Sequence, residues 1–328
     1  MKFGEMPDGS LVERHTIQGG GLRANFLSYG AVLQDLRLEG HDAPLVLGFE
    51  KFAPYLTDSP FFGAVAGRCA NRVRDGRITI DGETFQTDQN FLGKHMLHGG
   101  AKGAGKVNWM FDEVTDNSVR LVLNQPDGHM GFPGNLDVRY TVSCLDNGVL
   151  DIVIEAVTDK PTVANFAHHS YFNLDGGDST EAHLLQIDAD RYTVIDDEFI
   201  PTGESRDVKG SRFDFRVERA IGDETIIDHN LCLTDTKTPI RRIGHLRSKK
   251  SGVTMEMRST EPGLQVYDGF KLNVGPAGLD GRQYGANSGI ALEPQIWPDA
   301  VNHSTFPDAV LRPSETYRQH TQFAFSKR

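Results

Sequence analysis

Two adjacent histidines, His168 and His169, stand beside two aromatic residues in the segment HHSYFNLDGG. A histidine side chain titrates near neutral pH and can therefore give and take protons under cellular conditions. The rings of Tyr171 and Phe172 can supply a flat apolar wall next to the imidazoles. This combination predicts a proton-transfer site, provided that another part of the chain brings a second titratable group to it.

Glu293 is the best candidate for that second group. It follows the apolar residues Ile-Ala-Leu in IALEPQIWPDA, so we expect it to be nearly buried or to line a site. Burial raises the pKa of a carboxyl group toward neutrality, where general base catalysis is efficient. Trp297 follows in the same segment, and filling the core explains it as well as stacking on a ligand does.

Further segments contain side chains suited to binding hydroxyl groups. The arginine-rich segment GRCANRVRDG includes Asn71 and Arg72. Arginine presents a fixed fork of donors and asparagine offers a donor and an acceptor, although a charged surface turn explains the segment equally well. Asp228 lies among apolar residues in IIDHNLCL and needs partners if it is buried. Gln265 in EPGLQVYDG fits a hydroxyl-binding role and an ordinary polar strand position equally well.

One segment imitates a phosphate-binding loop. GAKGAGKV, residues 100–107, fits the pattern GxxxxGK. That loop continues with Ser or Thr to hold magnesium, and here the next residue is Val107. The preceding residues HMLHG do not form the apolar strand that such a loop requires. We therefore interpret the segment as a surface loop.

The histidines also raise the question of zinc. His95 and His98 are close in sequence, and His168 and His169 are adjacent. No HExxH pattern and no cysteine cluster accompanies them, and His98 precedes two glycines in a turn. We expect neither a metal nor an organic cofactor.

Five segments, in this order, resemble those of the aldose 1-epimerase family, the galactose mutarotases. They extend over most of the chain: GRCANRVRDGRITIDG, MLHGG, NFAHHSYFNLDG, IIDHNLCL with PGLQVYDG, and ALEPQIWPDAVNH. One such segment would be weak evidence, whereas five in one order are specific to a family. The resemblance implies a large antiparallel β-sandwich, the galactose mutarotase-like supersandwich. It also implies an isomerase that interconverts the α and β anomers of a free aldose, either a hexose such as galactose or glucose, or a pentose.

The resemblance also implies roles for individual residues. His169 matches the general acid of the family and Glu293 the general base. The substrate-binding positions of the family match five residues of this chain: Asn71, Arg72, His98, Asp228 and Gln265. At pH 7 these roles require a protonated His169 and an ionised Glu293, and opposite charges close together favour that combination.

The chain departs from the family pattern at three positions. His168 replaces the Asn that usually precedes the acid histidine, His95 replaces another usual Asn, and Pro294 replaces the Thr after Glu293. The change at His168 affects the hydrogen bonding around His169. The change at His95 affects which sugar the site accepts.

Three other functions compete with an epimerase. A glycoside hydrolase would use two carboxylates, which Asp228 and Glu293 can supply. A non-catalytic carbohydrate-binding protein can share the fold, because a fold does not determine a function. A hexose-phosphate 1-epimerase would need further cations directed into the site, for which Arg68, Arg74 and Lys94 are the candidates.

Composition restricts the partners and the compartment. The chain has 328 residues and a formal net charge of −11, which argues against binding to nucleic acid or to an anionic membrane. The 3 cysteines are widely spaced, no CxxC pattern occurs, and the N-terminus has no apolar signal segment. We expect a cytoplasmic protein that binds a small-molecule aldose and is a monomer or a homodimer.

Strand patterns dominate the elements that must position these residues. Residues 136–144 alternate apolar and polar side chains, residues 149–157 are more continuously apolar, and Asp81-Gly82 forms a hairpin turn signal in RITIDGETFQ. Helical signals are scarce, and residues 51–56 are the best candidate for a short helix. No composition break or repeat divides the chain. We therefore predict an all-β sandwich with a few short helices as one domain, residues 1–328.

Overall fold

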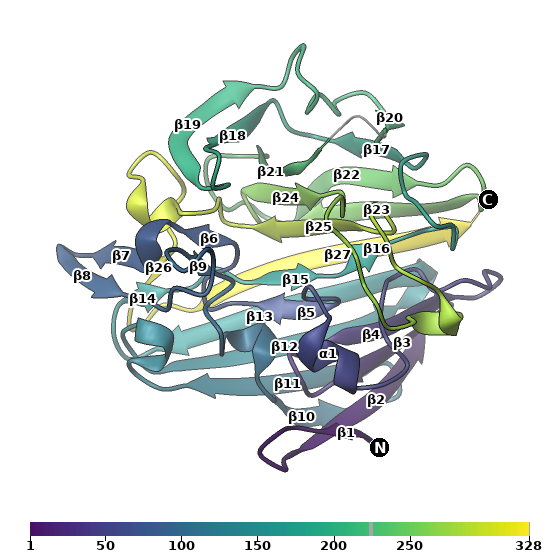
Figure 1. Ribbon diagram of the computed structural model, residues 1–328, viewed down its shortest axis with the longest axis horizontal. Coiled ribbons are helices and arrows are strands. Elements are labelled where there is room, and N and C mark those ends of the chain that lie inside the picture. The colour runs from purple at the N-terminus through teal and green to yellow at the C-terminus, as the bar shows by residue number, and fades with distance from the viewer. Residues whose placement is uncertain (223–225, 328) are drawn as a thin grey trace.

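Antiparallel sheets build almost the whole molecule (Figure 1). The computed structural model describes residues 1–222 and 226–327. The predicted alternation over residues 136–144 is confirmed in β12 (Leu136–Leu145), where the apolar residues up to Cys144 are buried and the polar residues between them are partly or fully exposed. In β13 (Val149–Thr158), buried residues alternate with partly buried ones. One face of each strand therefore lies against the core.

The largest sheet contains nine strands and curves through the molecule (Figure 1). Its order is β10 (Met110–Val114), β11 (Ser118–Gln125), β12, β13, β27 (Tyr317–Lys327), β23 (Val253–Ser259), β22 (Arg241–Arg247), β17 (Leu184–Ile187) and β20 (Arg219–Ala220). The C-terminal strand β27 lies between β13 and β23, so it joins the two halves of this sheet.

A six-stranded sheet packs against the nine-stranded one and carries Asp228, Gln265 and Glu293. Its order is β16 (Tyr171–Phe172), β25 (Ile290–Gln295), β24 (Gly263–Tyr267), β21 (Asp228–Cys232), β18 (Arg191–Ile195) and β19 (Pro201–Asp207). The rings of Phe172 in β16 and Phe323 in β27 have centroids 5.0 Å apart, which places the two sheets face to face.

Shorter elements complete the fold. The N-terminal sheet has the order β1 (Lys2–Glu5), β2 (Leu11–Gly19), β3 (Leu22–Leu27) and β4 (Leu33–Leu38). Four pairs of short strands are β5 (Ala64–Ala66) with β15 (Ala167–His169), β6 (Arg72–Val73) with β9 (Met96–Leu97), β7 (Arg77–Ile80) with β8 (Glu83–Gln86), and β14 (Thr162–Val163) with β26 (Val310–Leu311).

The predicted hairpin and short helix are both present. The hairpin around Asp81-Gly82 is β7 and β8, and the helix is α1 (Ala53–Thr57), which begins slightly later than predicted. The remaining helices are 3₁₀ turns: η1 (Arg74–Gly76), η2 (Ala104–Lys106), η3 (His129–Gly131), η4 (Asp146–Gly148), η5 (Leu279–Gly281) and η6 (Ala300–Asn302).

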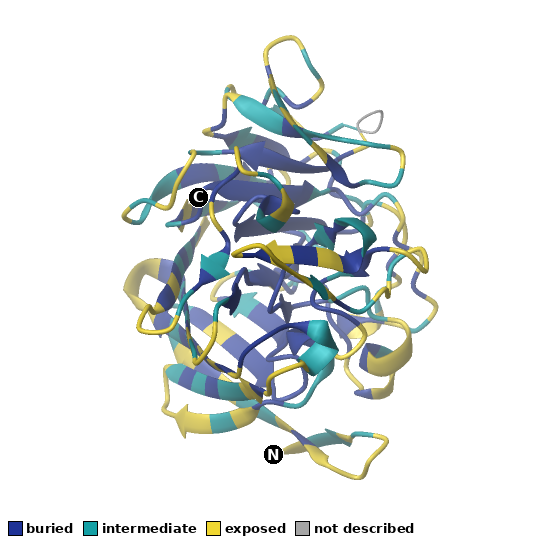
Figure 2. Ribbon diagram, turned by 90° about the vertical axis from the view of Figure 1, so that its left-hand side faces the viewer, coloured by how far each residue is buried: buried dark blue, intermediate teal, exposed yellow. Residues whose placement is uncertain are grey.

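The largest of the apolar clusters lies between the sheets. It includes Tyr140 and Ile152 of the nine-stranded sheet and Leu264 and Leu292 of the six-stranded sheet. Buried segments lie in the interior of the molecule, and exposed ones are concentrated at loops and outer strands (Figure 2). Over the described residues, no helix is long and apolar enough to cross a membrane.

Candidate active site

The six-stranded sheet carries three of the polar residues predicted from the sequence, Asp228, Gln265 and Glu293. Successive side chains of a strand point to opposite faces, and in β25 Leu292 lies in the core whereas Glu293 lies on the other face. The register pairs Glu293 with Gln265 of β24, and Gln265 with Asn230 of β21. The three strands therefore place one carboxyl and two amide side chains in a row across the sheet.

His169 joins this row from the neighbouring strand β15. The imidazole Nε2 of His169 lies 3.5 Å from Oε1 of Glu293. Both side chains are almost fully buried, with exposed fractions of 5% and 2%. The two groups predicted to transfer protons thus meet, although they come from distant parts of the chain.

Burial shifts the pKa of each group away from the charged form. It lowers the pKa of His169 to about 4 and raises the pKa of Glu293 well above its usual range, because leaving water disfavours the charged form. The negative charge of Asp228 raises the pKa of Glu293 further. Burial therefore opposes the expected charged pair, whereas the short distance between the two groups favours it.

Arg72, Asp228 and Gln265 form a second polar cluster beside this pair. The guanidinium Nη2 of Arg72 donates to Oδ2 of Asp228 at 2.8 Å, and the amide Nε2 of Gln265 donates to Oδ1 at 2.6 Å. Each oxygen of the carboxylate therefore already has a donor. The cluster is rigid and partly buried, which suits it to holding a polar ligand in one orientation.

Asn71 and His98 hold each other in place next to Arg72. The backbone N–H of Asn71 donates to the ring Nδ1 of His98 at 3.1 Å, and the backbone N–H of His98 donates to the Asn71 carbonyl at 2.9 Å. Because Nδ1 accepts and burial lowers the pKa of His98 well below its usual range, the neutral ring carries its proton on Nε2. Gly99 makes the following turn possible, since a Cβ there would lie 2.1 Å from the Gly67 carbonyl oxygen.

Aromatic rings surround the polar groups, and the sequence analysis missed three of them. The ring of Phe61 stacks on His169 with centroids 5.9 Å apart, and the rings of Phe91 and Phe199 both lie over the guanidinium of Arg72. Phe91 precedes MLHGG, where the departure from the family pattern was a usable signal. Phe199 lies in a loop without any motif, so no signal in the sequence indicated it.

Comparisons with known proteins identify the family of this chain. A sequence model of the family described as Aldose 1-epimerase matches residues 13–324. The galactose mutarotase of Bos taurus is 38% identical over 336 residues, covering 99% of this chain and 97% of that protein. The aldose 1-epimerase of Escherichia coli (strain K12) is 33% identical, covering 97% and 96%. The chain belongs to the aldose 1-epimerase family.

Solved structures of aldose epimerases have the same fold. A homologue from C. elegans superposes with a TM-score of 0.90 at 31% identity, covering 96% of this chain and 99% of that one. Galactose 1-epimerase from Lactobacillus acidophilus NCFM superposes with a TM-score of 0.86 at 28% identity, covering 100% and 98%. The predicted fold class is therefore confirmed, and the protein is an isomerase that interconverts the α and β anomers of aldoses.

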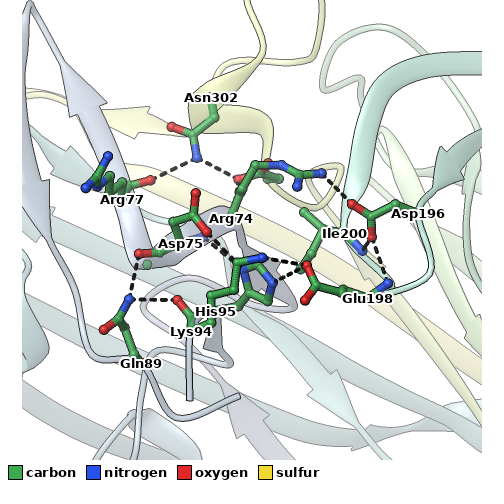
Figure 3. A network of polar contacts seen from close by, with 12 residues as sticks. Arg74, Asp75, Arg77, Gln89, Lys94, His95, Asp196, Glu198, Ile200 and Asn302 are labelled. Atoms are coloured by element: carbon green, nitrogen blue, oxygen red, sulfur yellow. Dashed lines mark hydrogen bonds and ion pairs between the residues drawn. The ribbon is translucent and has the colours of Figure 1, made fainter. Parts of the chain in front are cut away.

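Two loops that reach Arg72 in this aldose 1-epimerase are tied together by a polar network (Figure 3). Glu198 accepts from Lys94 at 2.8 Å and lies 3.2 Å from Nε2 of His95. The hydrogen bond from Lys94 and then that from His95 lower the pKa of Glu198. Nδ1 of His95 accepts from the backbone N–H of Asp75 at 2.9 Å. The fully buried His95 therefore links the loop that contains Glu198 to the backbone of Asp75.

The network extends to the turn that carries Phe199. Arg74 donates to Asp196 at 2.8 Å, and Oδ1 of Asp196 accepts from the backbone N–H groups of Glu198 and Ile200 (Figure 3). These bonds hold the turn in which Phe199 has a φ of 64°. Few non-glycine residues adopt that left-handed conformation, so the turn depends on its carboxylate.

The remaining candidates have structural roles in this aldose 1-epimerase. The buried Arg68 donates to the carbonyls of Pro133 and Gly134, so it points away from the sheet face that carries the site. Trp297 is buried and donates its indole N–H to the Pro262 carbonyl at 3.0 Å. The loop that imitates a phosphate-binding motif places Lys106 over the ring of Phe61, 4.5 Å from its centroid.

Proposed function

We propose that Glu293 is the general base and His169 the general acid of this aldose 1-epimerase. The observation that carries the proposal is the 3.5 Å separation of His169 Nε2 and Glu293 Oε1 on a sheet face that also holds the Arg72–Asp228–Gln265 cluster. A sugar bound on this face would place its hemiacetal at His169 and Glu293 and its other hydroxyls at the Arg72–Asp228–Gln265 cluster. A positioned proton-transfer group typically contributes ~10²–10⁴ in rate.

The reaction needs two proton transfers in each direction. Glu293 removes the proton of the C1 hydroxyl while His169 protonates the ring oxygen, and the bond between C1 and that oxygen breaks. The open chain then has an aldehyde at C1, and the C1–C2 bond turns by about half a revolution. Glu293 returns its proton to the aldehyde oxygen and His169 takes back the proton of the ring hydroxyl, which closes the ring on the other face.

Burial of His169 and Glu293 favours one of the two protonation states that this cycle passes through. Ring opening starts with a protonated His169 and an ionised Glu293, and it leaves a neutral His169 and a protonated Glu293 beside the open-chain aldehyde. Burial favours the second, neutral arrangement, since it lowers the pKa of His169 to about 4 and raises that of Glu293. The buried site therefore stabilises the protein state that accompanies the open-chain intermediate.

We assign the second polar cluster to the sugar hydroxyls. Arg72, Asp228 and Gln265 form a connected anchor, and His98 adds an Nε2–H donor. The amide nitrogen of Asn71 supplies one more donor, because its Oδ1 already accepts from the backbone N–H of Arg72 at 2.9 Å. These groups would hold C2 to C6 of the sugar while C1 turns. A site built on such bonds rejects analogues that lack the hydroxyls.

We propose a free hexose as the substrate. The relatives named galactose mutarotase point to galactose, glucose is the nearest alternative, and a pentose would leave part of the anchor unused. The three cations considered for a sugar phosphate are already engaged: Arg68 with backbone carbonyls, Arg74 with Asp196, and Lys94 with Glu198. This speaks against a hexose-phosphate 1-epimerase.

The glycoside hydrolase and the non-catalytic binding protein fit less well. A hydrolase would need Asp228 as its second acid or nucleophile, and each oxygen of that carboxylate already accepts a short hydrogen bond. A binding protein has no use for the facing pair of His169 and Glu293. Release of nitrophenol from a nitrophenyl galactoside would favour the hydrolase.

We infer that residues 1–328 act as one domain in the cytoplasm, as a monomer or a homodimer. The family match to residues 13–324 and the position of β27 between β13 and β23 support one domain. The cysteines Cys69, Cys144 and Cys232 are all buried and unpaired, as is common in a reducing compartment. Light scattering would decide between monomer and homodimer.

Polarimetry tests the assignment. Fresh α-galactose or α-glucose is followed to its equilibrium rotation with the wild-type protein, Glu293→Gln and His169→Asn. We expect each variant to lose ~10²–10⁴ in kcat. A wild-type rate in either folded variant would refute the role proposed for the residue that was exchanged. The same measurement on arabinose, xylose and glucose 6-phosphate identifies the preferred sugar.

A further inference from the structure

Gln295 has a fully buried side-chain amide without a hydrogen-bond partner in the described part of the chain. Its exposed fraction is 0%, and neither Nε2 nor Oε1 has a partner among the described residues. Buried amide groups are almost always hydrogen-bonded, because a donor or acceptor removed from water without a partner is destabilising. We therefore expect the Gln295 amide to bind a group other than these residues, such as a water molecule.

The place of Gln295 in the sheet connects it with Glu293. Both lie in β25 at alternate positions, so they share one face of the strand with Cα atoms about 6.7 Å apart. Oε1 of Glu293 faces His169, whereas Oε2 is sealed from solvent and has no partner among the described residues. A sealed carboxylate oxygen needs a donor before the group can ionise easily.

A third unpartnered atom lies across the neighbouring strand. Oδ1 of the buried Asn230 has no partner among the described residues. It lies 2.3 Å from the position that a Cβ of Gly263 would occupy, and Gly263 is the register partner of Gln295. Because Gly263 has no side chain, the amide of Asn230 extends over this residue toward β25.

The three residues have one unpartnered donor, Nε2 of Gln295, and three unpartnered oxygens, among them Oε1 of Gln295 itself. Gln295 supplies N–H groups, whereas Oδ1 of Asn230 and Oε2 of the ionised Glu293 accept. A water molecule can accept from Gln295 and donate to both oxygens, and three polar partners are typical of a buried water. We propose that Gln295 and Asn230 hold such a water against Oε2 of Glu293, which makes Gln295 a positioning residue for the base. The proposal rests on the proposed role of Glu293.

This water would act together with Arg72 and against burial and Asp228 on the pKa of Glu293. Asp228 on β21 and burial itself favour its protonated form, and Arg72 on β6 favours its charged form. Tyr171 also faces Glu293, and His98 and Lys106 face its partner His169. A hydrogen bond to the charged form of a carboxyl lowers its pKa, so the water makes Glu293 a base at a lower pH than burial alone would allow.

Carbon-13 NMR of protein labelled at the glutamate carboxyl carbons measures this effect directly. The Glu293 signal is identified by its loss in Glu293→Gln. In Gln295→Leu, which keeps the size of the side chain and removes the amide, we expect the pKa of Glu293 to rise by about one and kcat to fall about tenfold at neutral pH. An unchanged pKa of Glu293 would overturn the proposal.

Gln319→Leu is the matched control. Gln319 is equally buried and has an unpartnered Oε1, but its Nε2 donates to the Pro294 carbonyl at 2.6 Å from strand β27. Its loss should leave the pKa of Glu293 unchanged. If Gln295→Leu does not fold, a high-resolution crystal structure of the wild type decides: a water within about 3.2 Å of all three atoms supports the proposal, and a dry contact overturns it.

The two proposals fail in different ways. If Glu293→Gln keeps wild-type activity, Glu293 is not the base and the proposed function fails. If Glu293→Gln is inactive and the pKa of Glu293 is the same in Gln295→Leu as in the wild type, only the role of Gln295 fails.

Discussion

His168 and His169 are neighbours in the chain, yet their imidazoles lie on opposite faces of β15. His168 points into the core, where its Nδ1 lies 2.9 Å from the Tyr140 hydroxyl and its Nε2 lies 2.7 Å from the Ser170 hydroxyl. His169 points to Glu293. The period of a strand therefore separates a structural histidine from the proposed acid.

Exchanging each histidine for asparagine should separate stability from activity. His168→Asn restores the residue that the family usually has, but the shorter side chain cannot bond both hydroxyls, so we expect a loss of about 1–3 kcal/mol in unfolding free energy. Its kcat should remain near wild type. His169→Asn should do the reverse, with a large loss of kcat in polarimetry and little change in urea unfolding. Equal loss of kcat in both would contradict this division.

The pH dependence of stability should contain a contribution from His168. Burial lowers its pKa to about 3, whereas the unfolded chain has the ordinary value of 6.5. Below pH 6.5 the unfolded chain therefore binds a proton that the folded protein does not bind. Stability then falls by about 1.4 kcal/mol per pH unit toward pH 3 from this residue alone.

Urea unfolding of the wild type and His168→Asn between pH 7 and pH 4 measures that contribution. Buried carboxyls such as Glu293 act in the opposite sense in both proteins, so the difference between the two curves isolates His168. The wild type should lose stability more steeply than the variant as the pH falls. Parallel curves would show that the folded protein protonates His168 at its ordinary pKa.

Removing the charge of Asp228 should weaken sugar binding. In Asp228→Asn the ion pair with Arg72 is lost, and the new amide has one acceptor oxygen where the carboxylate had two. We expect kcat/KM to fall about 10–100-fold, since a hydrogen bond to a charged group is worth about 1.5–3 kcal/mol. Asp280→Asn is the control, because Asp280 pairs with Arg37 outside the site; polarimetry should find it unaffected.

The aromatic contacts of Arg72 should contribute to substrate affinity. Phe199→Ala removes one of the two rings over the guanidinium. We expect KM to rise several-fold, because such a contact is worth about 0.5–2 kcal/mol. Phe270→Ala is the comparison, since the ring of Phe270 lies near Lys271 rather than Arg72. A similar KM for both variants would mean that the ring of Phe199 does not position Arg72.

Much of this protein was predictable from local patterns. Apolar and polar residues alternate in β12, and the Asp81-Gly82 turn defines a hairpin, because each depends only on neighbours in the chain. The motifs around His169 and Glu293 identified the family before any coordinates. Residue types and their order were enough to predict the fold class and the isomerase activity.

The tertiary structure alone decided how these residues act. Whether His168 or His169 reaches Glu293 depends on which face of β15 meets the six-stranded sheet. The pKa of each group depends on burial by strands far away in the sequence, which favours the neutral form of both. Phe199 and Gln295 carry no motif, and they matter only because the sheet and its loops bring them to Arg72 and Glu293. Burial and distance are properties of the packed chain, so no local pattern contains them.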